Sequence, residues 1–357
     1  MLRLMSGAVV IGASFALVAP HAFAAPGEPV TIASDSGLYG TADPTFDGVF
    51  RQSMAILGLD AAGESIPTSA VTWLVGQQCD SGAFMAYRAD TTEPCPAPDP
   101  VAFTGPDSNS TALAALALTV AGEPDAADAA MTWLLAQQVR GGGWAYLPGS
   151  SVDTSSTGFA LAAVRALKPA GKRSVIREAT NFLRRAEANC SAEVADRFGM
   201  PYQPGLLPDT FSSSQSLLGL ANAFPVKEQA QRRGVPRTDC REDGRVDSPR
   251  AGVARWLARQ LNANDGALPN TYDPASIDWN STALTIIGLV AARTAGNATA
   301  QATDTLAANI EDYIGSAEGD RPAALGTSVM VAISTGNDPR DFGGTDLIRR
   351  LQDTRQR

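Results

Sequence analysis

One phrase recurs three times along this chain of 357 residues. Each copy begins with Gln shortly after a Trp-Leu pair, passes through a segment that contains Gly, and then reaches Asp, Ser and Thr ahead of an apolar run. The copies occupy residues 77–116, 137–164 and 260–289. An internal repeat of this length predicts a fold assembled from similar units, because each copy supplies one supersecondary element.

Two kinds of helix alternate along the chain. The helices that follow the Asp-Ser-Thr phrase are apolar on nearly all sides, which is typical of buried helices, whereas those that end in Trp-Leu-x-x-Gln carry charge on one side. The pattern predicts twelve helices, near residues 45–59, 67–78, 109–121, 125–138, 155–167, 173–187, 211–223, 249–261, 280–293, 302–315, 324–334 and 342–352.

This alternation predicts an all-α fold. Six buried helices and six outer helices form an (α/α)6 toroid if the last pair meets the first. A straight stack of repeats would need a polar cap at each end, and the sequence shows none. In this interpretation each Gly-rich phrase is the corner that leads from an outer helix to the next inner helix.

The first 24 residues have the pattern of a secretory signal peptide. Arg3 provides the positive start, Met5–Val18 is the apolar run, and Ala22-Phe23-Ala24 fits the cleavage site. We therefore expect a secreted protein that begins at Ala25, with residues 25–357 forming a single toroid domain. No later apolar run reaches the length of a membrane span, so we expect no integral membrane segment.

Cysteine and histidine usage limits the chemistry. Four cysteines in an oxidising compartment predict two disulfides, and of the three possible pairings we expect Cys79–Cys95 and Cys190–Cys240, because each pair brackets an irregular loop. A metal site is the weaker interpretation, since no C-x-x-C pair is present. His21 is the only histidine and leaves with the signal peptide, which excludes His-based triads and His metal sites; we expect no metal and no cofactor.

The net charge argues against a nucleic-acid partner. The chain carries a formal charge of -9, and removal of residues 1–24 takes away Arg3 and no acid, giving -10. An acidic surface repels the phosphate backbone.

The repeated phrases resemble those of the squalene-cyclase and protein-prenyltransferase superfamily. The full match to the QW repeat of that superfamily consists of Trp133, Leu134, Gln138, Gly142 and Trp144. A match with one substitution consists of Trp73, Leu74, Gln78, Gly82 and Phe84. A loose match consists of Trp256, Leu257, Gln260 and Gly266. The resemblance covers most of the chain after residue 24. It implies a helical toroid in which the Gln and Trp side chains brace one helix against the next.

The catalytic motif of the resembling cyclases is altered in this chain. Those cyclases carry Asp-x-Asp-Asp-Thr-Ala at an inner-helix start, and the middle Asp donates the proton. Here Asn109 and Asn280 stand at that position in two copies and Ser155 in a third. Neither Asn nor Ser holds a proton of suitable pKa, so the resemblance does not carry the cyclase activity to this chain. The zinc ligands of the prenyltransferases are also unsupported without His.

The corners supply the candidate site residues. Asp at an inner-helix start has an ordinary role as a helix cap, and about half of the corner aromatics are expected to belong to the core. The alternative is a ring of acceptors and aromatic faces at one mouth of the toroid. The candidate ligand-binding residues are Asp107, Asn109, Tyr146, Asp153, Tyr202, Asp209, Tyr272, Asp278, Trp279 and Asn280, with Trp279 first among them.

Several functions remain open from sequence. The first is a secreted, non-catalytic protein that binds a small apolar or isoprenoid-like ligand, or a partner, at the toroid mouth. The second is a terpenoid-cyclase-like enzyme with unorthodox acids. The third is a carbohydrate-active (α/α)6 enzyme, for which Asp43, Asp47, Asp273 and Asp278 are available, or a corrinoid-binding protein, because vitamin B12 carriers have helix starts similar to Asp153-Thr154.

Overall fold

Six helices form a closed inner ring in the computed structural model, which describes residues 36–238, 240 and 248–356. Each helix contacts the next in chain order, and the last returns to contact the first. These inner helices are α1 (Gly48–Ala61), α3 (Ser108–Val120), α5 (Thr154–Leu167), α7 (Thr210–Ala221), α9 (Trp279–Ala292) and α12 (Pro322–Thr335). The ring lies within the unit Ile32–Arg357.

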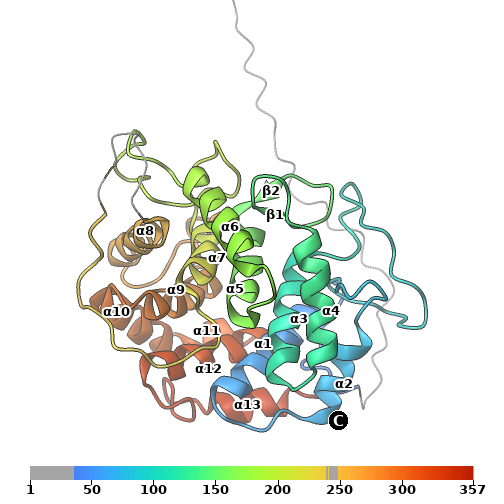
Figure 1. Cartoon of the computed structure of the whole chain (residues 1–357). Coiled ribbons are helices and arrows are strands. Elements are labelled where there is room, and N and C mark those ends of the chain that lie inside the picture. The colour runs from blue at the N-terminus through green and yellow to red at the C-terminus, as the bar shows by residue number, and fades with distance from the viewer. Residues whose placement is uncertain (1–35, 239, 241–247, 357) are drawn as a thin grey trace, which may run out of the picture. The chain divides into compact units, whose positions relative to one another are not determined.

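The remaining helices surround this ring (Figure 1). Each outer helix packs on the inner helix that precedes it in the chain. They are α2 (Thr68–Gly76), α4 (Pro124–Ala136), α6 (Lys172–Ala186), α8 (Pro249–Ala263), α10 (Gly296–Ala308) and α13 (Leu347–Asp353), with the short α11 (Ile310–Ile314) after α10. The predicted all-α toroid of six inner and six outer helices is therefore confirmed within the described residues.

Two predicted helices differ from the observed ones. The helix expected at 302–315 begins earlier, at Gly296, and is divided into α10 and α11 at Asn309, whose side-chain Nδ2 donates to the Thr305 carbonyl at 2.8 Å. The helix expected at 342–352 begins at Leu347, capped by Asp346. Phe342 instead pairs with Thr345 across Gly343 and Gly344, both of which have positive φ angles.

Glycines bring two pairs of inner helices into close contact. A Cβ atom on Gly326 of α12 would overlap the Met54 carbonyl of α1, and one on Gly158 of α5 would overlap the Gln215 carbonyl of α7. The absence of a side chain lets the two backbones approach at these crossings. Apolar side chains fill the rest of the ring, which makes it the core of the protein.

Two corners tie an outer helix to the next one. The Gln78 amide donates to the Gly82 carbonyl at 2.9 Å and to Ala126 of α4 at 2.8 Å. Gln138 does the same toward Gly142 and Val175 of α6, at 2.9 and 3.1 Å. The short strands β1 (Trp144–Ala145) and β2 (Val152–Asp153) pair antiparallel in the corner that leads to α5.

Two disulfides close the loops that the cysteine spacing indicated. Cys79 bonds Cys95 and Cys190 bonds Cys240, as predicted. Both are compatible with an oxidising compartment. No helix among the described residues is long and apolar enough to cross a bilayer. The predicted signal peptide, Met1–Ala24, lies outside the described residues.

Candidate binding site

Four aspartates cap the inner helices α3, α5, α7 and α9. In each case one carboxylate oxygen, Oδ1, accepts the backbone N–H of the serine three residues later. The donors are Ser110 to Asp107 at 2.7 Å, Ser156 to Asp153 at 2.6 Å, Ser212 to Asp209 at 2.6 Å, and Ser281 to Asp278 at 2.8 Å. The capping role expected for these residues is thus present in all four copies.

The second carboxylate oxygen distinguishes the four copies. Oδ2 of Asp153 accepts the Ser156 hydroxyl at 2.9 Å and the Tyr146 N–H at 3.1 Å. Asp209 repeats this arrangement with Ser212 and Tyr202, and Oδ2 of Asp278 accepts the Ser281 hydroxyl at 2.5 Å. Oδ2 of Asp107 is buried and has no hydrogen bond among the described residues.

Burial raises the pKa values of three of these carboxyl groups. The pKa of Asp107 rises to about 7, although the Ser110 amide and the nearby Tyr146 hydroxyl act in the opposite direction. Burial raises the pKa of Asp153 to about 6 and also raises that of Asp209, although the capping hydrogen bonds lower both values. The pKa of Asp107 thus lies closer to neutral pH than that of Asp153, because its burial is more complete.

Each corner tyrosine lies beside the start of the preceding inner helix. The carbonyl of Tyr146 accepts the Ser108 N–H at 2.8 Å, and the carbonyl of Tyr202 accepts the Thr154 N–H at 3.0 Å. Burial raises the pKa of both hydroxyl groups, and the carboxylates of Asp107 and Asp153 add to the effect. Tyr272 stands in the same relation to Asp209. Consecutive corners are thus joined into one rim.

The other predicted residues of this rim differ in exposure. Tyr272 is 82% exposed and Tyr202 is 37% exposed, whereas Trp279 is half-buried and packs against the core. Asn280 accepts the Tyr313 hydroxyl at 3.1 Å. Asn109 has a buried Oδ1 with no hydrogen bond among the described residues. The structure therefore brings all ten predicted residues to the end of the ring where the inner helices begin, which we term the amino end.

An apolar cavity lies at the opposite end, which we term the carboxyl end. Its volume is about 210 Å³, and its walls come from the last turns of α1, α3 and α5, from α12, and from the segment after α7. Asp60 and Thr119 are the polar lining residues, and the others are Leu57, Leu116, Val120, Ala166, Leu167, Phe224, Pro225, Val226 and Met330. This is the part of the molecule best suited to an apolar guest.

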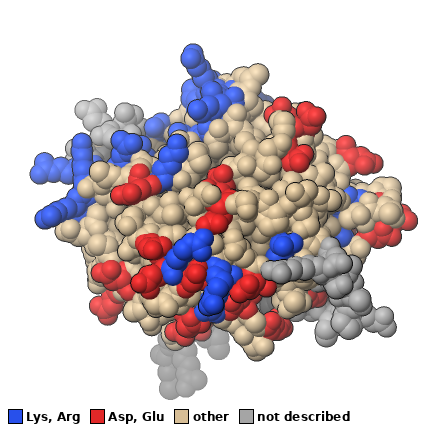
Figure 2. Space-filling view, turned by 90° about the horizontal axis from the view of Figure 1, so that it is seen from below, with Lys and Arg blue, Asp and Glu red and all other residues tan. Residues whose placement is uncertain are grey.

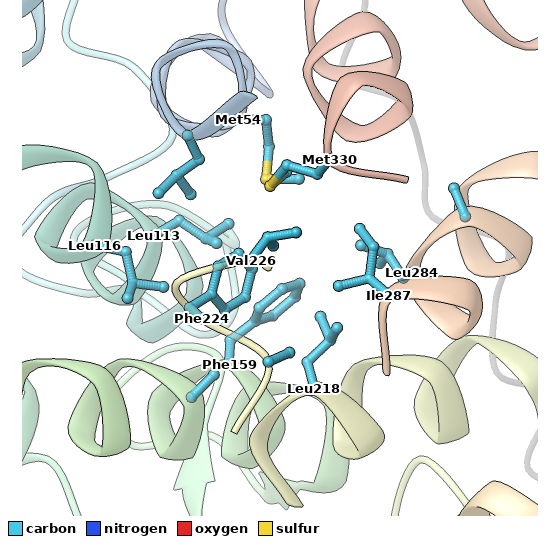
Figure 3. Packing of buried hydrophobic residues seen from close by; sticks show 14 of the residues in the cluster. Met54, Leu113, Leu116, Phe159, Leu218, Phe224, Val226, Leu284, Ile287 and Met330 are labelled. Carbon is cyan, nitrogen blue, oxygen red and sulfur yellow. The ribbon is translucent and has the colours of Figure 1, made fainter. Parts of the chain in front are cut away.

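The segment after α7 enters the ring and fills its centre. Phe224 is 2% exposed and Val226 is 9% exposed, although neither belongs to a helix. Figure 3 shows both side chains surrounded by apolar side chains from the inner helices, among them Met54, Leu284 and Phe159. We term residues 224–226 the plug. The sequence analysis missed it, and the signal that was available is an apolar Ala-Phe-Pro-Val run directly after a helix, in a stretch otherwise typical of a loop.

Groups that would hold a metal are not found in the described part of the chain. No cluster there contains three or more His, Cys, Asp or Glu residues in a metal-binding arrangement.

Comparison with known proteins gives the fold and no more. No protein-family model matches the chain, and no curated protein sequence matches it. Among solved structures, ent-copalyl diphosphate synthase from Streptomyces platensis is similar at 15% identity with a TM-score of 0.51; the match covers 81% of this chain and 50% of the synthase. This chain thus spans about half the length of that enzyme.

Two further structures are similar at lower scores. A type II terpene cyclase from Scytonema has 15% identity and a TM-score of 0.42 over 75% of this chain and 71% of the cyclase. A glycosidase has 15% identity and a TM-score of 0.49 over 84% of this chain and 92% of its own. At these identities the similarity concerns the course of the helices, since one fold hosts many functions.

Proposed function

We propose that the protein is exported and binds a small apolar ligand inside its helical ring without catalysing a reaction. The observation that carries this proposal is the apolar cavity at the carboxyl end, beside the plug. A mainly apolar lining suits an apolar guest, because it offers water few hydrogen bonds beyond those to Asp60 and Thr119.

The cavity volume limits the ligand. About 210 Å³ exceeds the ~150 Å³ that admits a benzene-sized guest and is below the roughly 300–1,000 Å³ typical of pockets for larger ligands. A compact apolar molecule therefore fits the ring as it stands. A longer, isoprenoid-like chain needs the space that Phe224 and Val226 occupy, so its binding displaces the plug.

The polar groups at the amino end support a role without catalysis. Asp153, Asp209 and Asp278 use both carboxylate oxygens for hydrogen bonds that hold the helix starts. These hydrogen bonds engage both oxygens of each carboxylate in capping a helix start, which is a structural role. The ring of predicted mouth residues is thus explained by the architecture in three of its four copies.

A titration of the mature protein with farnesol tests the proposal. Binding should displace a fluorescent apolar dye, and Val120→Phe should weaken it at least about tenfold, or ~1.4 kcal/mol, because Val120 lines the cavity and is only half-buried. Val139→Phe is the matched control, since Val139 is exposed on another part of the surface. Equal effects of the two substitutions, or no displacement of the dye, would contradict the proposal. Cobalamin serves as a bulky probe that the ring should not admit.

Asp107 favours a second candidate function, that of a cyclase-like enzyme with an unorthodox acid. Its Oδ2 lacks a hydrogen bond and its pKa is raised to about 7 by burial, as suits a group that donates a proton. Incubation with squalene and with oxidosqualene separates the two functions. The binding role predicts no cyclic products; products that disappear in Asp107→Asn would establish the enzymatic role instead.

A further inference from the structure

An arginine-lined crevice lies apart from the apolar cavity. It has a volume of about 1070 Å³ and is formed by the segment 230–237, the start of α8 and the end of α9. Four arginines line it: Arg232, Arg237, Arg250 and Arg293. All four are exposed, so their guanidinium groups are accessible to a ligand.

A second, smaller crevice continues from Arg250. It has a volume of about 220 Å³ and adds Arg165 from α5 and Arg184 from α6. The Nε atoms of both side chains are buried without a hydrogen bond among the described residues. Burial lowers the pKa of Arg165, and the positive charge of Arg250 lowers it further, which shows that like charges face each other here. We term the two cavities together the arginine crevice.

Carboxylates do not neutralise this cluster within the part of the chain that the structure describes. No Asp or Glu is among the residues that line either cavity. The described ion pairs engage other arginines, at positions 51, 177, 340 and 350. The carboxyl group of Glu187 interacts electrostatically with Arg184. Burial raises the pKa of Glu187 well above its usual range.

The concentration of positive charge contrasts with the whole chain, which carries a net charge of -9. In Figure 2 basic side chains gather at the left edge, at the top and in the lower centre, and acidic side chains lie between and beside these groups. The left edge corresponds to the side of Figure 1 on which α8 lies. Several exposed guanidinium groups that line one crevice, with no carboxylate among its described lining residues, offer concentrated positive charge to an anion.

The start of α8 adds a further attraction for anions. Arg250 and Ala251 belong to its first turn and line the crevice. The positive end of the helix dipole favours negative charge, although Pro249 has no N–H and the Ala251 N–H already donates to the Ser248 hydroxyl. Arginine side chains, in turn, offer paired N–H donors that match the oxygen atoms of phosphate groups.

We propose that the arginine crevice binds an anion with several adjacent phosphate groups, of the polyphosphate type. Several guanidinium groups around one large crevice exceed what a single phosphate can contact, and a chain of phosphates matches their number and spread. This site is independent of the apolar cavity, so it stands or falls separately from the proposed function.

Isothermal titration of the mature protein with tripolyphosphate tests this proposal. Binding should weaken as salt is raised, and Arg250→Gln and Arg232→Gln should each weaken it about tenfold. Arg140→Gln is the matched control, because Arg140 is exposed and has no described ion pair. Citrate serves as the polycarboxylate arm and should bind more weakly than tripolyphosphate.

Three outcomes would overturn the proposal. The first is an absence of binding heat at low salt. The second is an equal loss of affinity in Arg140→Gln and Arg250→Gln, which would show a general charge effect. The third is tighter binding of citrate than of tripolyphosphate, which would show that the crevice does not select phosphate groups.

Discussion

The two ends of the ring are built on different principles. At the amino end, one arrangement of Asp and Ser is repeated from corner to corner and caps the start of its own inner helix, and in two copies a Tyr carbonyl also bonds the start of the preceding inner helix. At the carboxyl end, the plug and the arginine crevice each occur once. The repeated end holds the ring together, whereas the features open to a ligand come from segments that have no counterpart in the other repeats.

This contrast changes how the repeated motif is interpreted. The start of every inner helix has N–H groups that need hydrogen-bond acceptors. Residues that recur in the copies meet this structural need. Asp107 departs from the pattern because its Oδ2 lacks the bonds found at Asp153 and Asp209. A departure from a repeat is thus more informative about function than the repeat itself.

The plug gives the largest expected effect. Phe224→Ala should lower the free energy of unfolding by about 3–5 kcal/mol, because it empties a buried space at the centre of the ring. Leu207→Ala, at a side chain that is 77% exposed, should cost less than about 0.5 kcal/mol and is the matched control. Chemical denaturation measures both.

The same variant sharpens the assignment of the cavity. Removal of the Phe224 side chain gives a longer ligand room without displacement of the plug, so Phe224→Ala should bind farnesol more tightly than the unchanged protein does. A loss of stability without any gain in farnesol affinity would mean that the plug is only a part of the core.

The pH dependence of Asp107 gives an intermediate effect. Its folded-state pKa of about 7 lies above the ~3.9 of an unfolded chain, so the folded state binds the proton more tightly. The contribution of this group is therefore most favourable at low pH, and it is lost as the pH rises from about 4 to about 7. Asp107→Asn keeps the cap and cannot ionise, so it should match the unchanged protein below about pH 4 and be more stable at pH 8, by up to about 4 kcal/mol, since each pKa unit corresponds to about 1.4 kcal/mol.

Denaturation curves of Asp107→Asn at the two pH values measure this effect. Asp153→Asn is the comparison, because its Oδ2 accepts two hydrogen bonds that an amide nitrogen cannot accept. It should be less stable than the unchanged protein at pH 8. A destabilised Asp107→Asn at pH 8 would show that the ionised carboxylate has a partner.

The exposed rim of the amino end gives the smallest effect. Tyr272→Ala should change stability by less than about 0.5 kcal/mol and leave the farnesol affinity unaltered, since Tyr272 is 82% exposed and lies away from the cavity. Trp279→Ala should cost more stability, because that side chain packs against the core, and should likewise leave binding unaltered. A loss of farnesol affinity in either variant would move the ligand site to the amino end.

Much of the amino end could be predicted from the sequence. The Asp-Ser-Thr phrases locate the starts of α3, α5, α7 and α9 to within one residue, because a capping side chain acts on N–H groups only three residues away. The weakest boundaries are those of α10, α11 and α13, where Asn309 and the pair Gly343-Gly344 alter the local path of the chain. The two disulfides also followed from the sequence, since each closes a single loop.

The sequence by itself determined the alternation of buried and outer helices, the capped helix starts and hence the closed ring, because all of these depend on short-range periodicity and on local hydrogen bonds. Only the tertiary structure decided where the plug and the arginine crevice lie. Phe224 and Val226 fill the centre of the ring from a loop, and six arginines from separate segments meet in one crevice. Neither arrangement has a local signature, since each depends on how parts distant in the chain are brought together once the helices have packed.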